Sequence, residues 1–415
     1  MFQPDKNLIR EFAELAVLVG TNVQKGQPIL INTPPEAYEL AKECARVAYE
    51  HGSSRVYINY GDEDLARMNY EYMTTEDLCE MPDWQISRQQ YLIDKKFCML
   101  HIIAEDPDLL NGIDPEKIKA ASLARMKTMK KFQYYTMNNI GQWSIIAYPN
   151  LAWAHKMFPE VEDDDEAIRK LWDAILMTSR VELGKTVSNW DVHNAEIKNH
   201  CDKMNEYGFK SLHFTNSLGT DLTVGLIKDH IWGGGSEEAL GDFKCEFHPN
   251  IPTEEVFTMP DRYHIDGKVY STKPLSYNGK IIPAFNLTFK DGVVVDYAAE
   301  ENIEVLKTIL DTDEGAKSLG EVALISYDSP ISNSGLLFYN TLFDENASCH
   351  LALGACYPTT VKGGADMSEE ELYELGGNNS MEHVDFMFGS ADLTVTGLTY
   401  DGEEIVVFKE GNFAF

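Results

Sequence analysis

The hydrophobic pattern of this 415-residue chain changes near its midpoint, and each half is restricted to a different class of fold. Up to about residue 190, short apolar runs alternate with stretches of helical periodicity, which is typical of βαβ units built on a parallel sheet. Strands are predicted at 28–32, 55–60, 97–103 and 143–147, and helices at 8–19, 37–50, 115–130, 165–179 and 192–207. We therefore expect an N-terminal α/β domain over residues 1–190.

Beyond about residue 205, strand and hairpin signals dominate the chain. Dipeptides that favour tight hairpin turns recur between β-branched or alternating stretches, namely Asp266-Gly267, Asn278-Gly279, Asp291-Gly292 and Asp401-Gly402. A helix is predicted at 299–310. The predicted fold class of the whole chain is therefore α/β, with the βαβ-type domain followed by a mixed α+β, strand-rich domain over residues 191–415.

The balance of charge excludes two classes of partner. Asp and Glu number 67 against 35 Lys and Arg, which gives a formal net charge of −32. Nucleic acids and anionic membranes are bound by neutralising phosphate with Lys and Arg, so we expect neither as a partner. The chain has no apolar run of about 18 residues that could span a membrane. Its seven cysteines form no Cys-x-x-Cys pair, which favours the reducing cytoplasm.

Several common functional motifs are incomplete or missing. Gly184-Lys185-Thr186 resembles the end of a phosphate-binding loop, but Ser179 stands where that loop needs its first glycine. No Gly-x-Gly-x-x-Gly follows the N-terminal strands, and neither Gly-x-Ser-x-Gly nor His-Glu-x-x-His occurs. Gly233-Gly234-Gly235 is interpreted as a flexible turn. Nucleotide binding and the helical zinc-protease motif are therefore not indicated.

Potential metal ligands stand in apolar or turn-rich context in four segments, at residues 250–258, 320–325, 340–354 and 376–390. His383 and Asp385 are two residues apart, so on a strand their side chains share one face. Of the neighbours Glu254 and Glu255, only one can face a given site. Imidazole and carboxylate together suit zinc, cobalt or manganese.

Plainer interpretations of these residues stay open at this point. His350 alone can be a hydrogen-bonded core histidine, Glu321 a cap at a strand end, and Glu345 a surface acid in a loop. An acidic chain also brings carboxylates together by chance.

The four segments resemble the signatures of the thermophilic aminopeptidase family, which includes aminopeptidase T, aminopeptidase S and streptococcal PepS. The matching stretches are Asn-x-Pro-Thr-Glu-Glu-Val-Phe-Thr, Leu-Gly-Glu-Val-Ala, Leu-Phe-Asp-Glu-Asn-Ala-Ser-Cys-His-Leu-Ala-Leu-Gly and His-Val-Asp-Phe-Met-Phe-Gly-Ser. Their order and spacing agree, and the resemblance runs over nearly the full chain. It implies a dinuclear metallopeptidase that removes N-terminal residues from peptides, with its catalytic metal site in residues 191–415.

The resemblance also implies roles for individual residues. The ligands of two divalent ions (zinc, cobalt or manganese) would be Glu255, Glu321, Glu345, His350, His383 and Asp385. Tyr357 matches the proposed catalytic tyrosine of the family, whereas the residues alone suggest a half-buried tyrosine at a strand end. The resemblance further implies a homodimer that acts on peptides with a free N-terminus.

Two other functions remain open from the sequence. One is a different two-metal hydrolase, such as a phosphoesterase, which usually adds Lys, Arg or backbone nests for phosphate. The four segments contain no Lys or Arg. The other is a non-catalytic protein of the same fold that binds peptides or metals. Such a protein would be expected to lack a ligand, and none of the implied ligands is missing.

Overall fold

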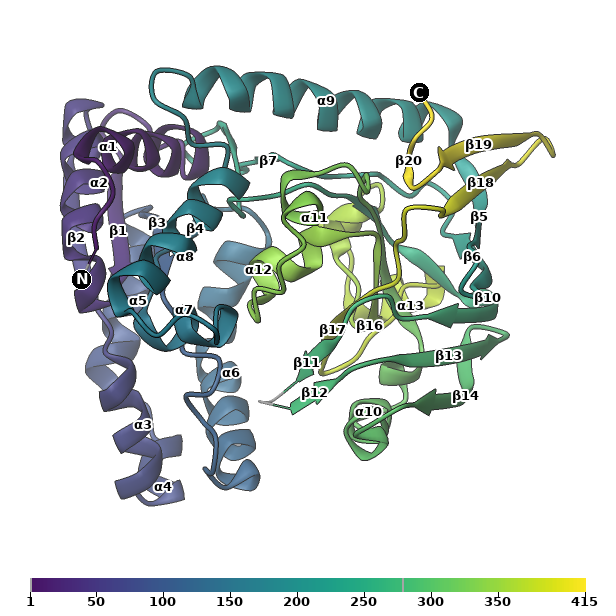
Figure 1. Ribbon diagram of the computed structural model, residues 1–415, viewed down its shortest axis with the longest axis horizontal. Helices are drawn as coiled ribbons and strands as arrows, with labels where there is room; N and C mark the ends of the chain where they lie inside the picture. The colour runs from purple at the N-terminus through teal and green to yellow at the C-terminus, as the bar shows by residue number, and fades with distance from the viewer. Residues whose placement is uncertain (1, 278–279) are drawn as a thin grey trace. The chain divides into compact units, whose positions relative to one another are not determined.

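The computed structural model describes residues 2–277 and 280–415. These residues form two compact units, one made of the chain up to Val192 together with Ser236–Pro252, and the other of His193–Gly235 together with Thr253–Phe415 (Figure 1). Helices and strands are mixed along the chain, so the predicted α/β class is confirmed.

A four-stranded parallel sheet forms the centre of the first unit. Its strand order is β2-β1-β3-β4. The strands are β1 (Pro28–Thr33), β2 (Arg55–Tyr60), β3 (Cys98–Ile103) and β4 (Trp143–Ala147), and all four were predicted. The inner strands β1 and β3 are mostly buried, in keeping with their continuous apolar runs.

The predicted helices of this part of the chain are also present. They are α1 (Lys6–Glu14, continued by a π-helical turn over Leu15–Gly20), α2 (Tyr38–Glu50), α6 (Pro115–Met137), α8 (Asp164–Thr178) and α9 (Thr186–Tyr207). Asp114 caps α6, because its carboxylate accepts a hydrogen bond from the Glu116 amide.

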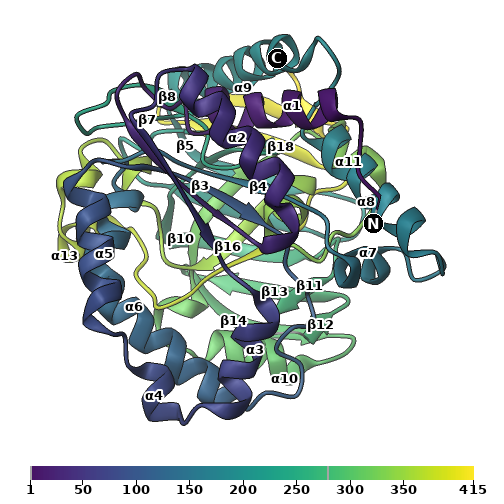
Figure 2. The same ribbon diagram turned by 90° about the vertical axis from the view of Figure 1, so that its left-hand side faces the viewer.

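Three helices between β2 and β3 were not predicted, namely α3 (Glu63–Tyr72), α4 (Thr75–Cys79) and α5 (Asp83–Asp94). Neither α3 nor α4 buries a residue fully, so neither carries an apolar stripe that periodicity could reveal. Their starts are fixed by side-chain caps from Asp62 and Thr74. In Figures 1 and 2, α4 lies beside the long helix α6, against which it packs.

Among the described residues, the second unit contains two larger antiparallel sheets and a two-stranded one formed by β11 (Leu275–Tyr277) and β12 (Lys280–Ile282). Of the two larger sheets, one has eight strands in the order β14-β13-β10-β6-β5-β18-β19-β20. The smaller has the order β17-β16-β15-β9, with β17 at His383–Met387, β16 at His350–Gly354, β15 at Leu319–Leu324 and β9 at Val256–Thr258. Side chains from both sheets share one buried cluster, in which Phe214 contacts Phe388 and Phe285 contacts Phe386. The strands of the larger sheet are β5 (Phe209–Thr215), β6 (Asp221–Leu226), β10 (Pro260–Tyr270), β13 (Phe285–Lys290), β14 (Val293–Ala299), β18 (Thr394–Thr399), β19 (Glu404–Lys409) and β20 (Asn412–Phe413).

The hairpin predictions have different outcomes. Asp291-Gly292 joins β13 to β14 and Asp401-Gly402 lies in the turn between β18 and β19, so both are confirmed. The Asp266-Gly267 turn is wrong, because both residues lie inside β10. Gly267 has φ +120°, and a Cβ there would lie 2.2 Å from the Asp221 carbonyl oxygen of β6. Only glycine therefore lets β10 and β6 lie this close together at that position. Asn278-Gly279 lies outside the described residues.

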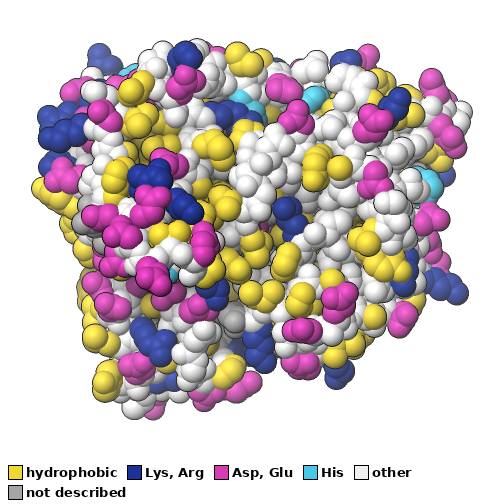
Figure 3. Space-filling model, viewed as in Figure 1, with side chains coloured by type: hydrophobic (Ala, Val, Ile, Leu, Met, Phe, Trp, Pro, Cys, Tyr) yellow, Lys and Arg dark blue, Asp and Glu magenta, His cyan; other side chains and the backbone are white. Residues whose placement is uncertain are grey.

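The predicted helix at 299–310 is shorter than expected. Helix α10 spans Ile303–Leu310, and Ala299 still belongs to strand β14. Among the described residues no helix is both long and apolar enough to cross a membrane. On the face drawn in Figure 3, acidic side chains are scattered among Lys and Arg.

Glu63, the first residue of α3, gives the first unit a pH-dependent stability. Burial, together with the carboxylates of Glu105, Asp106 and Glu36, raises the pKa of Glu63 to about 7, although the Asp106 amide donates a hydrogen bond to it. The folded pKa therefore exceeds the unfolded one of about 4.3. The stability that Glu63 contributes to the first unit is fully present below the unfolded pKa and is lost as pH rises through the folded pKa.

We expect Glu63→Gln to raise the melting temperature at about pH 8 and to leave it unchanged at about pH 4, because the amide keeps the acceptor and removes the charge. Thermal melts at both pH values test this, with Glu80→Gln at an exposed position as the control. A shift of equal size at both pH values would assign the effect to packing instead of charge.

Candidate metal centre

The pairing of three strands places acidic and imidazole side chains on one face of the smaller sheet, which consists of β9 (Val256–Thr258), β15 (Leu319–Leu324), β16 (His350–Gly354) and β17 (His383–Met387). Glu321 of β15 pairs with Ala352 of β16, which pairs with Asp385 of β17. Residues paired across a sheet point to the same side. His350 and His383 lie two positions from Ala352 and Asp385, so they share that face.

Small residues keep this face open. Ala352 stands between Glu321 and Asp385, and Gly354 stands opposite His383. Larger side chains at these two positions would fill the space between the polar groups. The other face of the same strands carries Leu351, Leu353, Val384 and Phe386 into the core of the unit. Strict alternation therefore separates the polar face from the apolar one.

The polar groups lie within a few ångströms of one another. His350 Nε2 is 3.3 Å from Glu255 Oε2 and 3.3 Å from Glu321 Oε1. His383 Nε2 is 3.6 Å from Glu321 Oε2 and 3.3 Å from Asp385 Oδ1. Two groups could each hold an ion, one formed by Glu255, Glu321 and His350 and the other by Glu321, His383 and Asp385. The structure thus brings together five residues that sequence analysis singled out.

Glu255 is positioned by the three glycines that were interpreted as a flexible turn, and that interpretation is wrong. Gly233 and Phe257 exchange two backbone hydrogen bonds of 3.0 and 2.8 Å, so the glycines pair with strand β9. A Cβ on Gly234 would lie 2.2 Å from the Glu255 carbonyl oxygen. Only glycine permits this approach, which fixes the backbone that carries the Glu255 carboxylate.

Asn346 is a positioning residue that sequence analysis missed. It is fully buried, and its side chain accepts a hydrogen bond of 2.8 Å from the Glu254 amide. The same side chain donates to the Leu342 carbonyl and, at 3.4 Å, to Glu345 Oε1. It therefore links the segment before β9 to the turn that carries Glu345. The only signal in the sequence is an amide side chain directly after Glu345 in an apolar segment.

Burial and like charges perturb the ionisation of this site strongly. Burial, followed by the neighbouring carboxylates, raises the pKa of Glu345 well above its usual value, and burial raises the pKa of Glu321. Burial opposes a charged imidazole, yet Asp385 and Glu321 raise the pKa of His383 to about 10. His350 is raised well above its usual pKa by Glu255 and Glu321 against the same opposing burial. Clusters of this kind are typical of functional sites.

Each imidazole is oriented by a backbone carbonyl. His383 Nδ1 lies 2.7 Å from the Ala355 oxygen, and His350 Nδ1 lies 3.4 Å from the Ser348 oxygen. An Nδ1–H that donates to a carbonyl directs Nε2 at the carboxylates, where Nε2 either carries a proton or would bind a metal in its place. This is the arrangement in which proteins hold histidine ligands of metals.

Tyr357 lies beside this cluster. Its ring centroid is 4.9 Å from that of His383 and 6.0 Å from that of Phe257. The side chain is 37% exposed, but burial of the phenol, together with Glu321 and Asp385, raises its pKa well above 10. The phenol therefore remains protonated at neutral pH. Thr360 donates its hydroxyl to the Tyr357 carbonyl at 2.7 Å, which anchors this loop.

Comparison with known proteins identifies the family. The model of the thermophilic metalloprotease family (M29) matches residues 5–413. The chain belongs to this family. It is therefore a metallopeptidase, a hydrolase of peptide bonds, and the resemblance noted in the four segments is confirmed.

Curated relatives of this M29 chain are similar over their whole length. Aminopeptidase 2 of Geobacillus stearothermophilus is 44% identical over 98% of this chain and 97% of its own, and aminopeptidase T of Thermus aquaticus is 37% identical over 98% of both. The solved structure of wild-type AmpT from Thermus thermophilus superposes with a TM-score of 0.91 at 36% identity, covering 99% of this chain and 100% of that one.

We expect Glu255→Gln to lower the metal bound per chain and to abolish peptidase activity, because the amide removes one negative charge from the group around His350. Elemental analysis and a peptidase assay on the same preparation test this. Glu254→Gln is the matched control, because neighbouring residues of an extended chain point to opposite sides and only one of the two glutamates can face the site. A larger loss of metal in the Glu254 variant would reverse the assignment.

Proposed function

We propose that this M29 member is an aminopeptidase whose site would hold two divalent cations, with Glu321 among the ligands of both. The observation that carries the proposal is that Glu321 belongs to both candidate ion-binding groups. Its Oε1 faces His350 and its Oε2 faces His383. A carboxylate that turns its oxygens to two separate groups has the geometry of a bridging ligand in a two-metal site.

The donor set fits divalent cations. Asp385 Oδ1 is buried and, among the described residues, accepts no hydrogen bond, although His383 Nε2 lies 3.3 Å from it. A buried carboxylate oxygen of this kind is costly unless a cation compensates it. Four carboxylates (Glu255, Glu321, Glu345 and Asp385) and two imidazoles offer the mixed oxygen and nitrogen ligands that suit zinc, cobalt or manganese.

The surrounding residues support hydrolysis at a peptide N-terminus. Bound cations would polarise the scissile carbonyl and acidify a water molecule. The protonated Tyr357 phenol donates a hydrogen bond to the carbonyl oxygen as negative charge develops on it. The remaining negative potential of the carboxylates favours a free α-ammonium group. The names of the relatives, all aminopeptidases, support this choice of substrate. The family resemblance supports a homodimer, and the cysteines, which are all free, favour the cytoplasm.

Hydrolysis should require both a free N-terminus and metal. We expect release of the first residue from a tripeptide, no release from its N-acetylated form, loss of activity on chelation, and recovery with two equivalents of metal per chain. Mass spectrometry of the products and elemental analysis measure these quantities. Equal turnover of the acetylated peptide would contradict the exopeptidase assignment.

Tyr357→Phe should keep both metals and a near-normal KM while kcat falls by roughly 10²–10³-fold, because a donor to the developing oxyanion acts mainly in the transition state. Tyr373→Phe is the matched control, since Tyr373 is 39% exposed. If kcat of the Tyr357 variant stays within a few-fold of the parent enzyme at full metal content, Tyr357 is not catalytic.

A further inference from the structure

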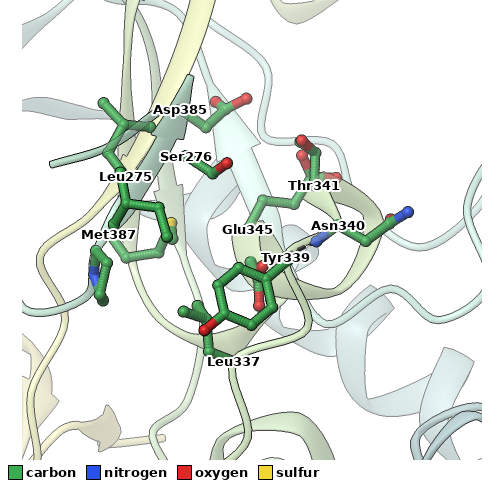
Figure 4. Close-up of a pocket in the computed structure, with 12 residues that line it drawn as sticks. Leu275, Ser276, Leu337, Tyr339, Asn340, Thr341, Glu345, Asp385 and Met387 are labelled. Atoms are coloured by element: carbon green, nitrogen blue, oxygen red, sulfur yellow. Dashed lines mark hydrogen bonds between the residues drawn. The ribbon is translucent and has the colours of Figure 1, made fainter. Parts of the chain in front are cut away.

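A pocket of about 90 Å³ opens directly beside the candidate metal centre. Glu345 and Asp385 lie on its lining, so the pocket is continuous with the carboxylates of that centre. Figure 4 shows Leu275, Ser276 and Met387 on one side and Asn340 and Thr341 on the other. The first side comes from β11 (Leu275–Tyr277) and β17, and the second from the loop before and the start of α12 (Thr341–Asp344).

We propose that this pocket receives the side chain of the substrate's N-terminal residue and selects an uncharged, aliphatic one. The inference rests on the proposed aminopeptidase function. In an aminopeptidase the Cβ of the first residue is two covalent bonds from the scissile carbonyl carbon. Its side chain must therefore occupy space immediately next to the metal centre, and the pocket supplies that space.

The chemistry of the lining favours an apolar occupant. Leu275, Leu337 and Met387 present aliphatic and thioether groups, as in most pockets that bind apolar ligands. The charged residues of the lining are all acidic, namely Asp344, Glu345 and Asp385. Among the described residues that line the pocket there is neither Lys nor Arg, so the lining offers the side chain of an N-terminal Asp or Glu no cationic side chain to pair with.

The size of the pocket favours aliphatic over aromatic side chains. An engineered apolar cavity of roughly 150 Å³ in another protein is large enough for benzene. The present pocket, at about 90 Å³, is smaller. It suits the branched or linear side chains of Val, Leu and Met more closely than an aromatic ring.

The loop that forms the second wall is held in an unusual conformation. Tyr339, which lines the pocket, has φ +55°, a left-handed value that is rare for a residue with a Cβ. The buried Asp344 carboxylate fixes it by accepting hydrogen bonds from the amides on either side, Phe338 at 2.8 Å and Asn340 at 3.1 Å. Backbone strain that is held in this way clusters at ligand-binding sites. The backbone of this wall is therefore held in a fixed conformation.

Enlarging the pocket should change the size preference. We expect the unaltered enzyme to hydrolyse Leu-Ala-Ala at least about 10-fold better in kcat/KM than Phe-Ala-Ala or Glu-Ala-Ala. Leu337→Ala should raise the Phe-to-Leu ratio of kcat/KM about 10-fold. Leu336→Ala is the matched control, because Leu336 is also half-buried but does not line the pocket. The ratio is independent of how much of each preparation is active.

Adding a positive charge should change the charge preference. Ser276 lines the pocket and is exposed, so Ser276→Arg is compatible with folding. It should raise the Glu-to-Leu ratio of kcat/KM about 10-fold, because the added guanidinium pairs with the substrate carboxylate. The neutral Ser276→Gln should leave that ratio unchanged. The pocket does not bind the first side chain if the variants still cleave the peptides with unchanged preferences. This means that the Phe-to-Leu ratio of the Leu337 variant and the Glu-to-Leu ratio of the Ser276 variant both stay within about twofold of the unaltered enzyme. If the unaltered enzyme cleaves none of the three tripeptides, the aminopeptidase proposal fails, and the pocket assignment fails with it.

Discussion

The carboxylates of Glu255, Glu321, Glu345 and Asp385 meet in a volume where burial removes the water that would otherwise separate their charges. Their mutual repulsion is tolerated because His350 and His383 lie between them and because the surrounding backbone leaves little freedom to move apart. The packing of the second unit holds the backbone of these strands rigid. The apolar side of the same strands packs into the shared core of both sheets, so the polar side cannot rotate outward.

The sequence contains enough information to place some of these groups and too little to place others. His383 and Asp385 could be put on one face because alternation along a strand is a local property. That Glu321 lies in the same row as Asp385 depends on pairing through Ala352, between segments distant in the chain, which no local pattern encodes. The candidate ligand set was predicted from the family resemblance of four segments taken together.

The structural roles of the glycines were the hardest to predict, because they too depend on pairing with segments distant in the chain. Asp291-Gly292 and Asp266-Gly267 look alike in sequence, yet the first is a turn and the second lies inside β10 against β6. Gly234 also serves the approach of another backbone, that of Glu255. Helices α3 and α4 were missed for the opposite reason, since both lie at the surface and are specified by caps more than by buried faces. Tyr339 and Asp344 were not singled out because a left-handed tyrosine has no signature in sequence.

The residues of the candidate centre are contributed by four stretches of chain that are otherwise connected by long segments. Ions held by Glu255, Glu321, His383 and Asp385 would therefore act as cross-links, each closing long loops at one point. Because such ions would bind the folded chain and have no assembled site in the unfolded one, they would stabilise the fold by mass action. The temperature at which the chain unfolds would then depend on its medium as well as on its sequence, rising with the free concentration of the bound metal.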